Sequence, residues 1–314
     1  MISIPILVVG FNRPDLLEGV LGKLRELHAT NVYVSLDGPR NPVEAQKCDS
    51  SFAVAQDFLT SFHLKIAFRN YNLGCNLGVV SALDWFFSEV DFGIVIEDDC
   101  FPEQGMFSFF QEFRDKENYY NSLRTYFVTG HNPLVKSPDD QISKYFFVGA
   151  WATWSKSWRM VRKNYFKVTT PKMRNLLFEK RSFRESVYWW VNSTRAKLGF
   201  LDTWDGIFND HAWRLGYKTL VPAKNYFINL GFRSDATHTK NPTGTNLAVV
   251  DKEALHKNLF DQVILKYYYK IRFFHSLTPL LRLLVELVVR RKRINLDVAL
   301  RYDNENKTII TSFD

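Results

Sequence analysis

Residues 4–27 read IPILVVGFNRPDLLEGVLGKLREL, and this stretch decides the fold class. Its first six residues are almost entirely apolar, which is typical of a strand buried on both faces of a sheet. Pro14 then stands where a helix begins, and the leucines and the valine that follow it recur at helical spacing. The stretch therefore predicts a strand followed by a helix, the first half of a βαβ unit.

The next seventy residues repeat this alternation. We predict further strands at residues 31–36, 64–68 and 92–96, with helices at residues 43–62 and 77–90. Strands separated by helices of this length predict an α/β fold of the Rossmann type, in which a mostly parallel sheet is flanked by helices.

The second half of the chain has a different composition. Beyond residue 107 the alternation becomes irregular, and seven of the eight tryptophans lie between residues 151 and 213. These aromatic rings either fill the core or, for one or two of them, face a sugar acceptor. We therefore expect a nucleotide-sugar-binding subdomain at 1–105, an aromatic-rich acceptor-binding and catalytic subdomain at 106–250, and a helical basic tail at 251–314.

The net charge of +8 is concentrated in that tail, where residues 261–293 hold eight basic and two acidic residues. The remainder is nearly balanced, which argues against a nucleic-acid-binding face. Within the tail, Thr278 and Pro279 predict the start of an apolar helix that ends in Arg290-Arg291-Lys292-Arg293. This helix either lies in an anionic membrane interface or packs on the catalytic domain with a solvated basic end.

The cysteines and the N-terminus predict a cytoplasmic location. Cys48, Cys75 and Cys100 are too few and too scattered for a disulfide framework, and their spacing does not match a metal site. The N-terminus has the pattern of a first strand and lacks the basic region of a signal peptide. No apolar run reaches the roughly 20 residues that span a bilayer, so membrane contact would be peripheral, on the inner face of the plasma membrane.

Polar residues follow each of the four predicted strands. They are Asn12 and Arg13 after the first, Asp37 after the second, Arg69 and Asn72 after the third, and Glu97, Asp98 and Asp99 after the fourth. Ligands of open parallel sheets bind beyond the carboxyl ends of the strands. Polar loops alone would explain any one of these groups, but four groups at one edge favour a ligand site.

The acidic triplet Glu97-Asp98-Asp99 is the most specific of these signals. Adjacent carboxylates at the edge of a core repel one another, and a divalent cation relieves that repulsion. Hard oxygen ligands suit Mg²⁺ or Mn²⁺, whose coordination shells substrate phosphates usually complete. The alternative is a solvated acidic turn.

Three segments at these spacings resemble a known family: Phe11-Asn12-Arg13-Pro14, Val34-Ser35-Leu36-Asp37-Gly38 and Ile96-Glu97-Asp98-Asp99. They are similar to the GT-A glycosyltransferases that include the Golgi N-acetylglucosaminyltransferase which starts complex N-glycans, and to its bacterial relatives. The resemblance implies a GT-A fold, a nucleotide-sugar donor with UDP favoured, and a variant of the "DXD" metal motif. It assigns Asp99 to Mn²⁺, Glu97 and Asp98 to the sugar-nucleotide, Asp37 to uracil, and Arg13 with the neighbouring Asn12 to the nucleotide. Arg69 and Asn72 would line the same cleft.

Downstream segments extend the resemblance to about residue 240. Phe147-Val148-Gly149-Ala150-Trp151 looks like the family's acceptor-side segment, and Trp204-Asp205 looks like its W-D pair, whose aspartate is the catalytic base. The chain departs from the family after Asp205, so Asp210 is a competing base. His238 either completes the metal shell or is structural.

These residues predict a metal-dependent, inverting transfer of a sugar to a glycan or lipid-linked acceptor in cell-surface polysaccharide synthesis. A base opposite the leaving diphosphate would deprotonate the acceptor hydroxyl. The Gly-rich loop of nucleotidyltransferases and the G-x-G-x-x-G of dinucleotide-dependent oxidoreductases are both missing. The alternative from another class is a non-catalytic, membrane-associated protein that binds nucleotide-sugars or glycans.

Overall fold

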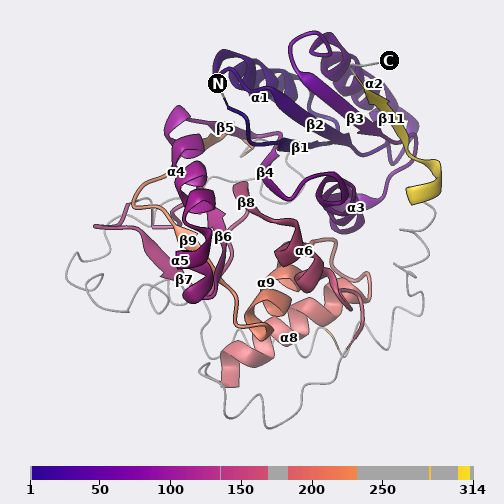
Figure 1. The fold of residues 1–314 in the computed structure, drawn as a ribbon. Coiled ribbons are helices and arrows are strands. Elements are labelled where there is room, and N and C mark those ends of the chain that lie inside the picture. Colours follow the sequence, from indigo (N-terminus) through magenta and orange to yellow (C-terminus); the bar gives the residue numbers. More distant parts are fainter. Residues whose placement is uncertain (1, 135, 169–182, 232–282, 284–302, 312–314) are drawn as a thin grey trace.

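The computed structural model describes residues 2–134, 136–168, 183–231, 283 and 303–311. Within these ranges a nine-stranded sheet forms the centre of the molecule, in the order β11-β3-β2-β1-β4-β8-β6-β9-β7 (Figure 1). A separate antiparallel pair joins β5 (Cys100–Pro102) to β10 (Phe227–Asn229). The predicted α/β fold is confirmed by this topology.

The N-terminal half of the sheet is parallel, as predicted. Its strands are β1 (Ile6–Gly10), β2 (Asn31–Leu36), β3 (His63–Phe68) and β4 (Phe92–Glu97). They are connected by α1 (Pro14–Glu26), α2 (Pro42–Asp57) and α3 (Gly74–Glu89). Val8 of the central strand pairs with Val34 on one side and Ile96 on the other, so the polar residues after these three strands meet at one edge.

The second half of the sheet is mixed. β8 (Ala150–Trp154) runs antiparallel between β4 and β6 (Thr125–Thr129), and β9 (Lys218–Val221) is parallel to β6 but antiparallel to β7 (Gln141–Ser143). These strands are three to five residues long, and β8 is buried throughout and lacks the alternation that marks a strand in sequence. The sheet therefore continues past residue 105, and the three-part division of the chain stays a prediction.

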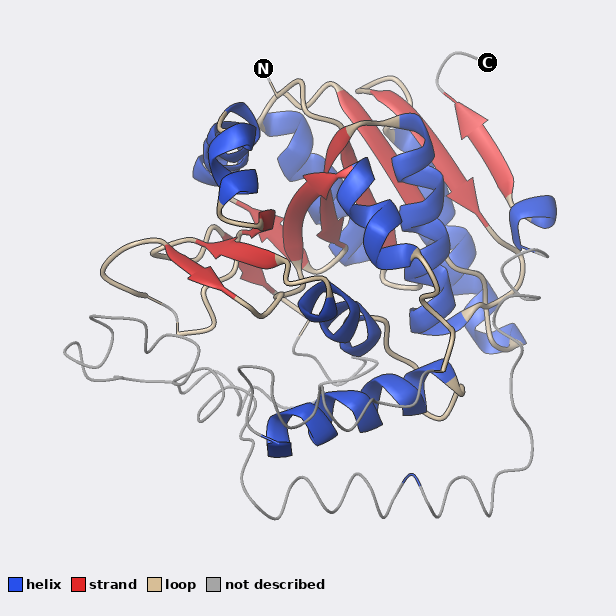
Figure 2. Ribbon diagram, turned by 60° about the horizontal axis from the view of Figure 1, so that its bottom comes forward, coloured by secondary structure: helices blue, strands red, loops and turns tan. Residues whose placement is uncertain are grey.

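Helices cover both faces of the sheet, as Figure 2 shows, because successive side chains of each strand point to opposite sides. On one face, Ile6 and Val8 pack in a core that includes residues of α1, α2 and α4 (Gln104–Asp115). On the other face, Leu7 packs with residues of α3, α6 (Ser155–Arg162) and α9 (Asp205–Arg214). Burial on both faces explains why the parallel strands are continuous apolar runs.

Two helix boundaries differ from the prediction for tertiary reasons. α2 ends five residues early, because Phe58 and Phe62 stack on each other in the turn that follows and are both buried. α3 begins three residues early, at Gly74. There the Asp202 carboxylate, from a distant part of the chain, accepts the N–H groups of Cys75 at 3.0 Å and Asn76 at 2.8 Å, and so caps the helix.

Most of the clustered tryptophans fill the core. Trp151, Trp154, Trp158, Trp189 and Trp204 are buried, whereas Trp190 and Trp213 are half-buried. Trp151 stacks on Trp204 with ring centroids 5.9 Å apart, and both pack around Phe208 of α9. Core packing is therefore the role of these five rings, and the sugar-facing alternative is left to the other two.

The remaining described elements are α5 (Glu117–Ser122), α8 (Phe183–Lys197) and β11 (Thr308–Thr311). The predicted tail helix lies outside the described residues except for Leu283, which is buried against Val191 and Phe200. Among the described helices, none combines the length and the apolar character needed to cross a membrane.

Candidate functional site

The carboxyl ends of β1, β2 and β4 form one polar edge. The chain after each strand stays bound to its neighbour, since the Asp37 N–H donates to Gly10 O at 3.2 Å and the Asp98 N–H donates to Val9 O at 3.0 Å. Asp37, Arg13 and the acidic triplet are thereby held on the framework of the sheet and not on free loops. This is the edge at which open α/β sheets bind ligands.

Arg13 forms ion pairs with two of the three carboxylates. Its Nη1 donates to Asp99 Oδ2 at 2.8 Å and its Nε donates to Asp98 Oδ2 at 3.3 Å, with a further bond from Nη2 to Asp98 Oδ1. Burial still raises the pKa of Asp98 to about 6, although the Arg13 charge opposes that rise. Asn12 precedes Arg13 in the same half-buried turn.

The third carboxylate, Glu97, lies in a negative environment. Burial and the charges of Asp99 and Asp98 together raise its pKa to about 8, whereas the Arg13 charge lowers it. The charge of Asp205, a residue from the other half of the chain, also raises this pKa. Arg13 pairs with Asp98 and Asp99, and Glu97 beside them adds further negative charge when it ionises, so an added cation would relieve the excess negative charge.

The strand pair β5–β10 completes the surroundings of Asp99. Asn229 Nδ2 donates to Asp99 Oδ1 at 3.4 Å, and the Leu230 N–H donates to Asp99 O at 2.9 Å. A Cβ added at Gly231 would overlap Asp99 Oδ2, so only glycine fits beside this carboxylate. Neither Asn229 nor Gly231 is among the site residues predicted from the sequence.

Asp37 organises a loop. Its carboxylate accepts the N–H groups of Gly38, Leu73 and Gly74 at 2.9–3.0 Å and the Asn72 amide at 2.9 Å. Burial raises its pKa to about 6, against the lowering effects of these backbone bonds and of Arg69. Asp37 and Asn72 therefore lie together as the resemblance implies, and the role of Asp37 in binding a base stays a prediction.

Arg69, expected in the same cleft, is instead buried. Its side chain is 1% exposed and forms an ion pair with Asp303, which is fully buried and 234 residues away in sequence. Its Nη1 also donates to Ser35 Oγ at 3.2 Å and Leu36 O at 3.3 Å. A side chain so enclosed does not line a cleft, because its donors are already used inside the protein.

The two candidate bases have different surroundings. Asp205 is half-buried at the first residue of α9, where Thr203 Oγ1 donates to its Oδ1. Asp210 is buried and accepts from Arg214 Nε at 3.1 Å. Besides its effect on Glu97, the Asp205 charge adds to the raised pKa of Cys75, which burial and Asp202 raise most. Asp205 is therefore the candidate whose charge acts on Glu97 at the sheet edge.

The oxygen donors at this edge fit a metal held jointly with a ligand. Across the described ranges, no group of three or more His, Cys, Asp or Glu side chains is arranged to enclose an ion. His238, the other predicted metal ligand, lies outside those ranges. Mg²⁺ and Mn²⁺ need only one or two protein carboxylates when phosphates supply the other ligands, and Asp99 with its neighbours meets that requirement.

The charge at this edge makes stability depend on pH. The pKa of Glu97 is raised in the folded state, so its uncharged form is favoured by folding. Its contribution to the free energy of unfolding is therefore fully present below the pKa of the unfolded chain and is lost as pH rises through about 8. At pH 8.5 we expect the free energy of unfolding of Glu97→Gln to exceed that of the wild-type protein by roughly 1–3 kcal/mol, so that the variant unfolds at a higher urea concentration. The two proteins should converge at pH 5.

Urea unfolding at several pH values measures this difference. Glu18→Gln, at an exposed glutamate of α1, is the matched control and should follow the wild-type curve at every pH. Equal free energies of unfolding for Glu97→Gln and wild type at pH 8.5 would show that the charged form of Glu97 does not destabilise the folded protein.

Comparison with known proteins gives similarity to solved structures alone. No family model matches the chain, and no curated protein matches it. Among solved structures, the chain is similar to the apo structure of the bifunctional glycosyltransferase WbbM, with 12% sequence identity and a TM-score of 0.31. The match covers 62% of this chain and 37% of that one. Likeness at this level carries no argument about activity, so the resemblance to the Golgi enzyme rests on the sequence motifs.

Proposed function

We propose that this chain is a metal-dependent, inverting glycosyltransferase. It transfers a sugar from a nucleotide-sugar, with UDP as the favoured nucleotide, to a glycan or lipid-linked acceptor of cell-surface polysaccharide synthesis. The observation that supports the proposal best is the acidic triplet at the carboxyl edge of a parallel sheet, in which Asp98 and Asp99 are buried and Glu97 is half-buried, together with the effect of the Asp205 charge on Glu97.

The charges at this edge suit a diphosphate only when a cation is present. Asp98 and Asp99 together outweigh Arg13, so an anionic ligand alone would be repelled. A divalent cation held by Asp99 would supply Lewis-acid stabilisation of the negative charge on the leaving diphosphate. Arg13 adds a fixed positive charge at the same place, and Asp37 with Asn72 forms the adjoining wall at the end of β2.

Asp205 supplies the base in this scheme. It removes the proton from the acceptor hydroxyl as the oxygen of that hydroxyl attacks the anomeric carbon and the bond from that carbon to the diphosphate breaks. Its place at the start of α9 leaves the carboxylate half-exposed, so an acceptor can reach it. Attack on the face opposite the leaving group inverts the configuration at the anomeric carbon.

A thermal-shift screen of UDP-, GDP- and CMP-sugars, each with and without Mn²⁺, tests the proposal. A donor at about 100 times its Kd stabilises the native state by about 2.7 kcal/mol, so the melting temperature should rise by several degrees. We expect this rise with a UDP-sugar and only when Mn²⁺ is present. Binding without any turnover would favour the non-catalytic alternative, and no shift with any donor would refute the proposal.

A further inference from the structure

The last described residues, 303–311, lie beside β3, close to the polar edge where the proposed nucleotide-sugar donor would bind. Residues 303–306 form a helical turn, and β11 pairs antiparallel with β3, from Thr308 opposite Phe68 to Thr311 opposite Lys65. This pairing covers the outer edge of the parallel strands. Figure 1 shows the segment in yellow along β3, although Thr308 and its partner Phe68 are 240 residues apart in sequence.

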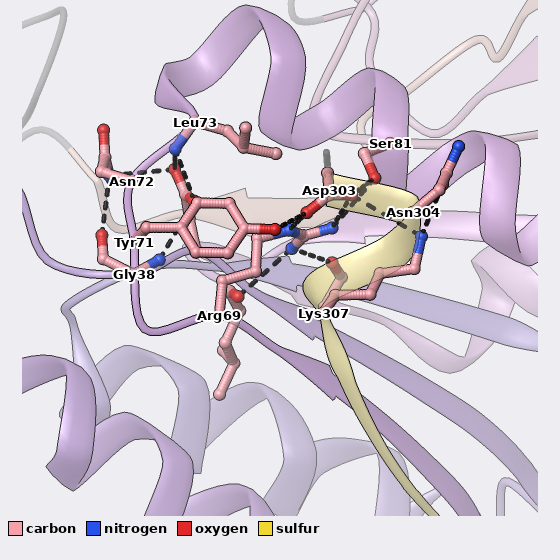
Figure 3. Close-up of polar contacts among 12 residues, drawn as sticks. Gly38, Arg69, Tyr71, Asn72, Leu73, Ser81, Asp303, Asn304 and Lys307 are labelled. Atoms are coloured by element: carbon pink, nitrogen blue, oxygen red, sulfur yellow. Dashed lines mark hydrogen bonds and ion pairs between the residues drawn. The ribbon is translucent and has the colours of Figure 1, made fainter. Parts of the chain in front are cut away.

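Asp303 anchors this segment in the core, as Figure 3 shows. One carboxylate oxygen accepts from Arg69 Nε and from the Tyr71 hydroxyl at 3.0 Å. The other accepts from Ser81 Oγ of α3 and from Arg69 Nη2 at 3.2 Å, and Lys307 Nζ lies 3.6 Å from it. The ion pair and the hydroxyl bonds hold the pKa of Asp303 below its usual value in spite of burial.

The Tyr71 bond connects Asp303 to the loop around Asp37. The Gly38 N–H donates to Tyr71 O at 3.1 Å, and a Cβ at Gly38 would overlap the Tyr71 backbone, so the two segments are in close contact. The next residue, Asn72, donates to Asp37 Oδ2 at 2.9 Å and Gly38 O at 2.7 Å. A continuous path of short contacts therefore runs from Asp303 to the Asp37 carboxylate.

We infer that Asp303 is a positioning residue of the proposed nucleotide-sugar site around Asp37. Residues 303–311 would then be required for the binding of the donor. Asp303 holds the Tyr71 hydroxyl, and Tyr71 fixes the loop of residues 71–74 that contacts the Asp37 carboxylate. The inference rests on the proposed function for the identity of the ligand, but the coupling of Asp303 to the loop is a property of the free protein.

Tyr71→Phe is the sharpest test, because it removes the hydrogen bond between Tyr71 and Asp303 and leaves the Arg69–Asp303 ion pair in place. Asp303→Asn is the second variant, which also removes the charge opposite Arg69. Tyr119→Phe, at a tyrosine of α5 that is 60% exposed, is the matched control. Amide hydrogen exchange is measured in the ligand-free proteins, and UDP affinity is measured by calorimetry with MnCl₂.

We expect the Gly38, Leu73 and Gly74 amides to exchange at least about tenfold faster in Tyr71→Phe and Asp303→Asn, with exchange in β1 unchanged. UDP should bind at least about fivefold more weakly to both variants, and Tyr119→Phe should match wild type.

Unchanged exchange of the loop amides would overturn the inference. So would faster exchange with unchanged UDP affinity, because the loop would then be irrelevant to the site. If the wild-type protein binds no UDP while the variants exchange faster, the coupling of Asp303 to the loop stands and the proposed function fails.

Discussion

Replacing Asp99 with alanine is expected to abolish the release of UDP from a UDP-sugar in the presence of Mn²⁺, a loss of about 10³-fold or more. Asp99 is the proposed metal ligand, and hydrolysis of the donor by water needs the same stabilisation of the departing diphosphate as transfer does. The side chain also contacts Arg13 and Asn229, so Asp99→Asn, which keeps its size, separates loss of charge from loss of packing.

The measurement is UDP released over time at several Mn²⁺ concentrations. Asp91→Asn is the matched control, because Asp91 is exposed at the opposite end of β4 and should leave the rate unchanged. If Asp99→Asn hydrolyses the donor at the wild-type rate and with the same dependence on Mn²⁺, Asp99 is not a metal ligand. The central premise of the proposed mechanism would then be wrong.

The second large effect is expected at Asp205. Asp205→Asn should lower kcat for donor hydrolysis by about 10²–10⁴-fold, because a general base contributes on that scale. The affinity for UDP with Mn²⁺ should change little, since the base faces the acceptor and not the nucleotide. Steady-state kinetics and calorimetry on the same preparation measure the two quantities.

Asp210→Asn provides the contrast on the same helix. Asp210 is buried against Arg214, so its loss should lower the free energy of unfolding by roughly 1–3 kcal/mol and leave kcat within a few-fold of wild type. The reverse pattern, with kcat lost in Asp210→Asn and kept in Asp205→Asn, would make Asp210 the base.

The parallel half of the fold could be predicted because its signals are local. Each strand from β1 to β4 is an apolar run. The helical spacing of the apolar residues between these strands places the start of α1 at Pro14 and the start of α3 within three residues of Gly74. The rule that parallel strands end at one edge then places Arg13, Asp37 and the acidic triplet together without further information. The ion pairs of Arg13 with Asp98 and Asp99 are a consequence of that placement.

The mixed half of the sheet could not be predicted in the same way. β8 is five buried residues inserted between β4 and β6, and a short buried strand has no periodicity that distinguishes it from a buried loop or helix. The clustered tryptophans indicated a specialised second half in which one or two rings would line an acceptor cleft, and only the two-sided burial of the sheet decided which five of them fill the core.

Arg69 illustrates a position that the sequence predicts and a contact that only the tertiary structure decides. The chain alone determined that a basic residue follows β3, since strand ends are read from local pattern. Only the folded molecule decided that this guanidinium turns inward to Asp303, 234 residues away, and that Asp202 caps α3. Partners of buried charges are selected by desolvation, which penalises any unpaired ion in the core. That selection depends on which distant segments are packed together, and no local pattern encodes it.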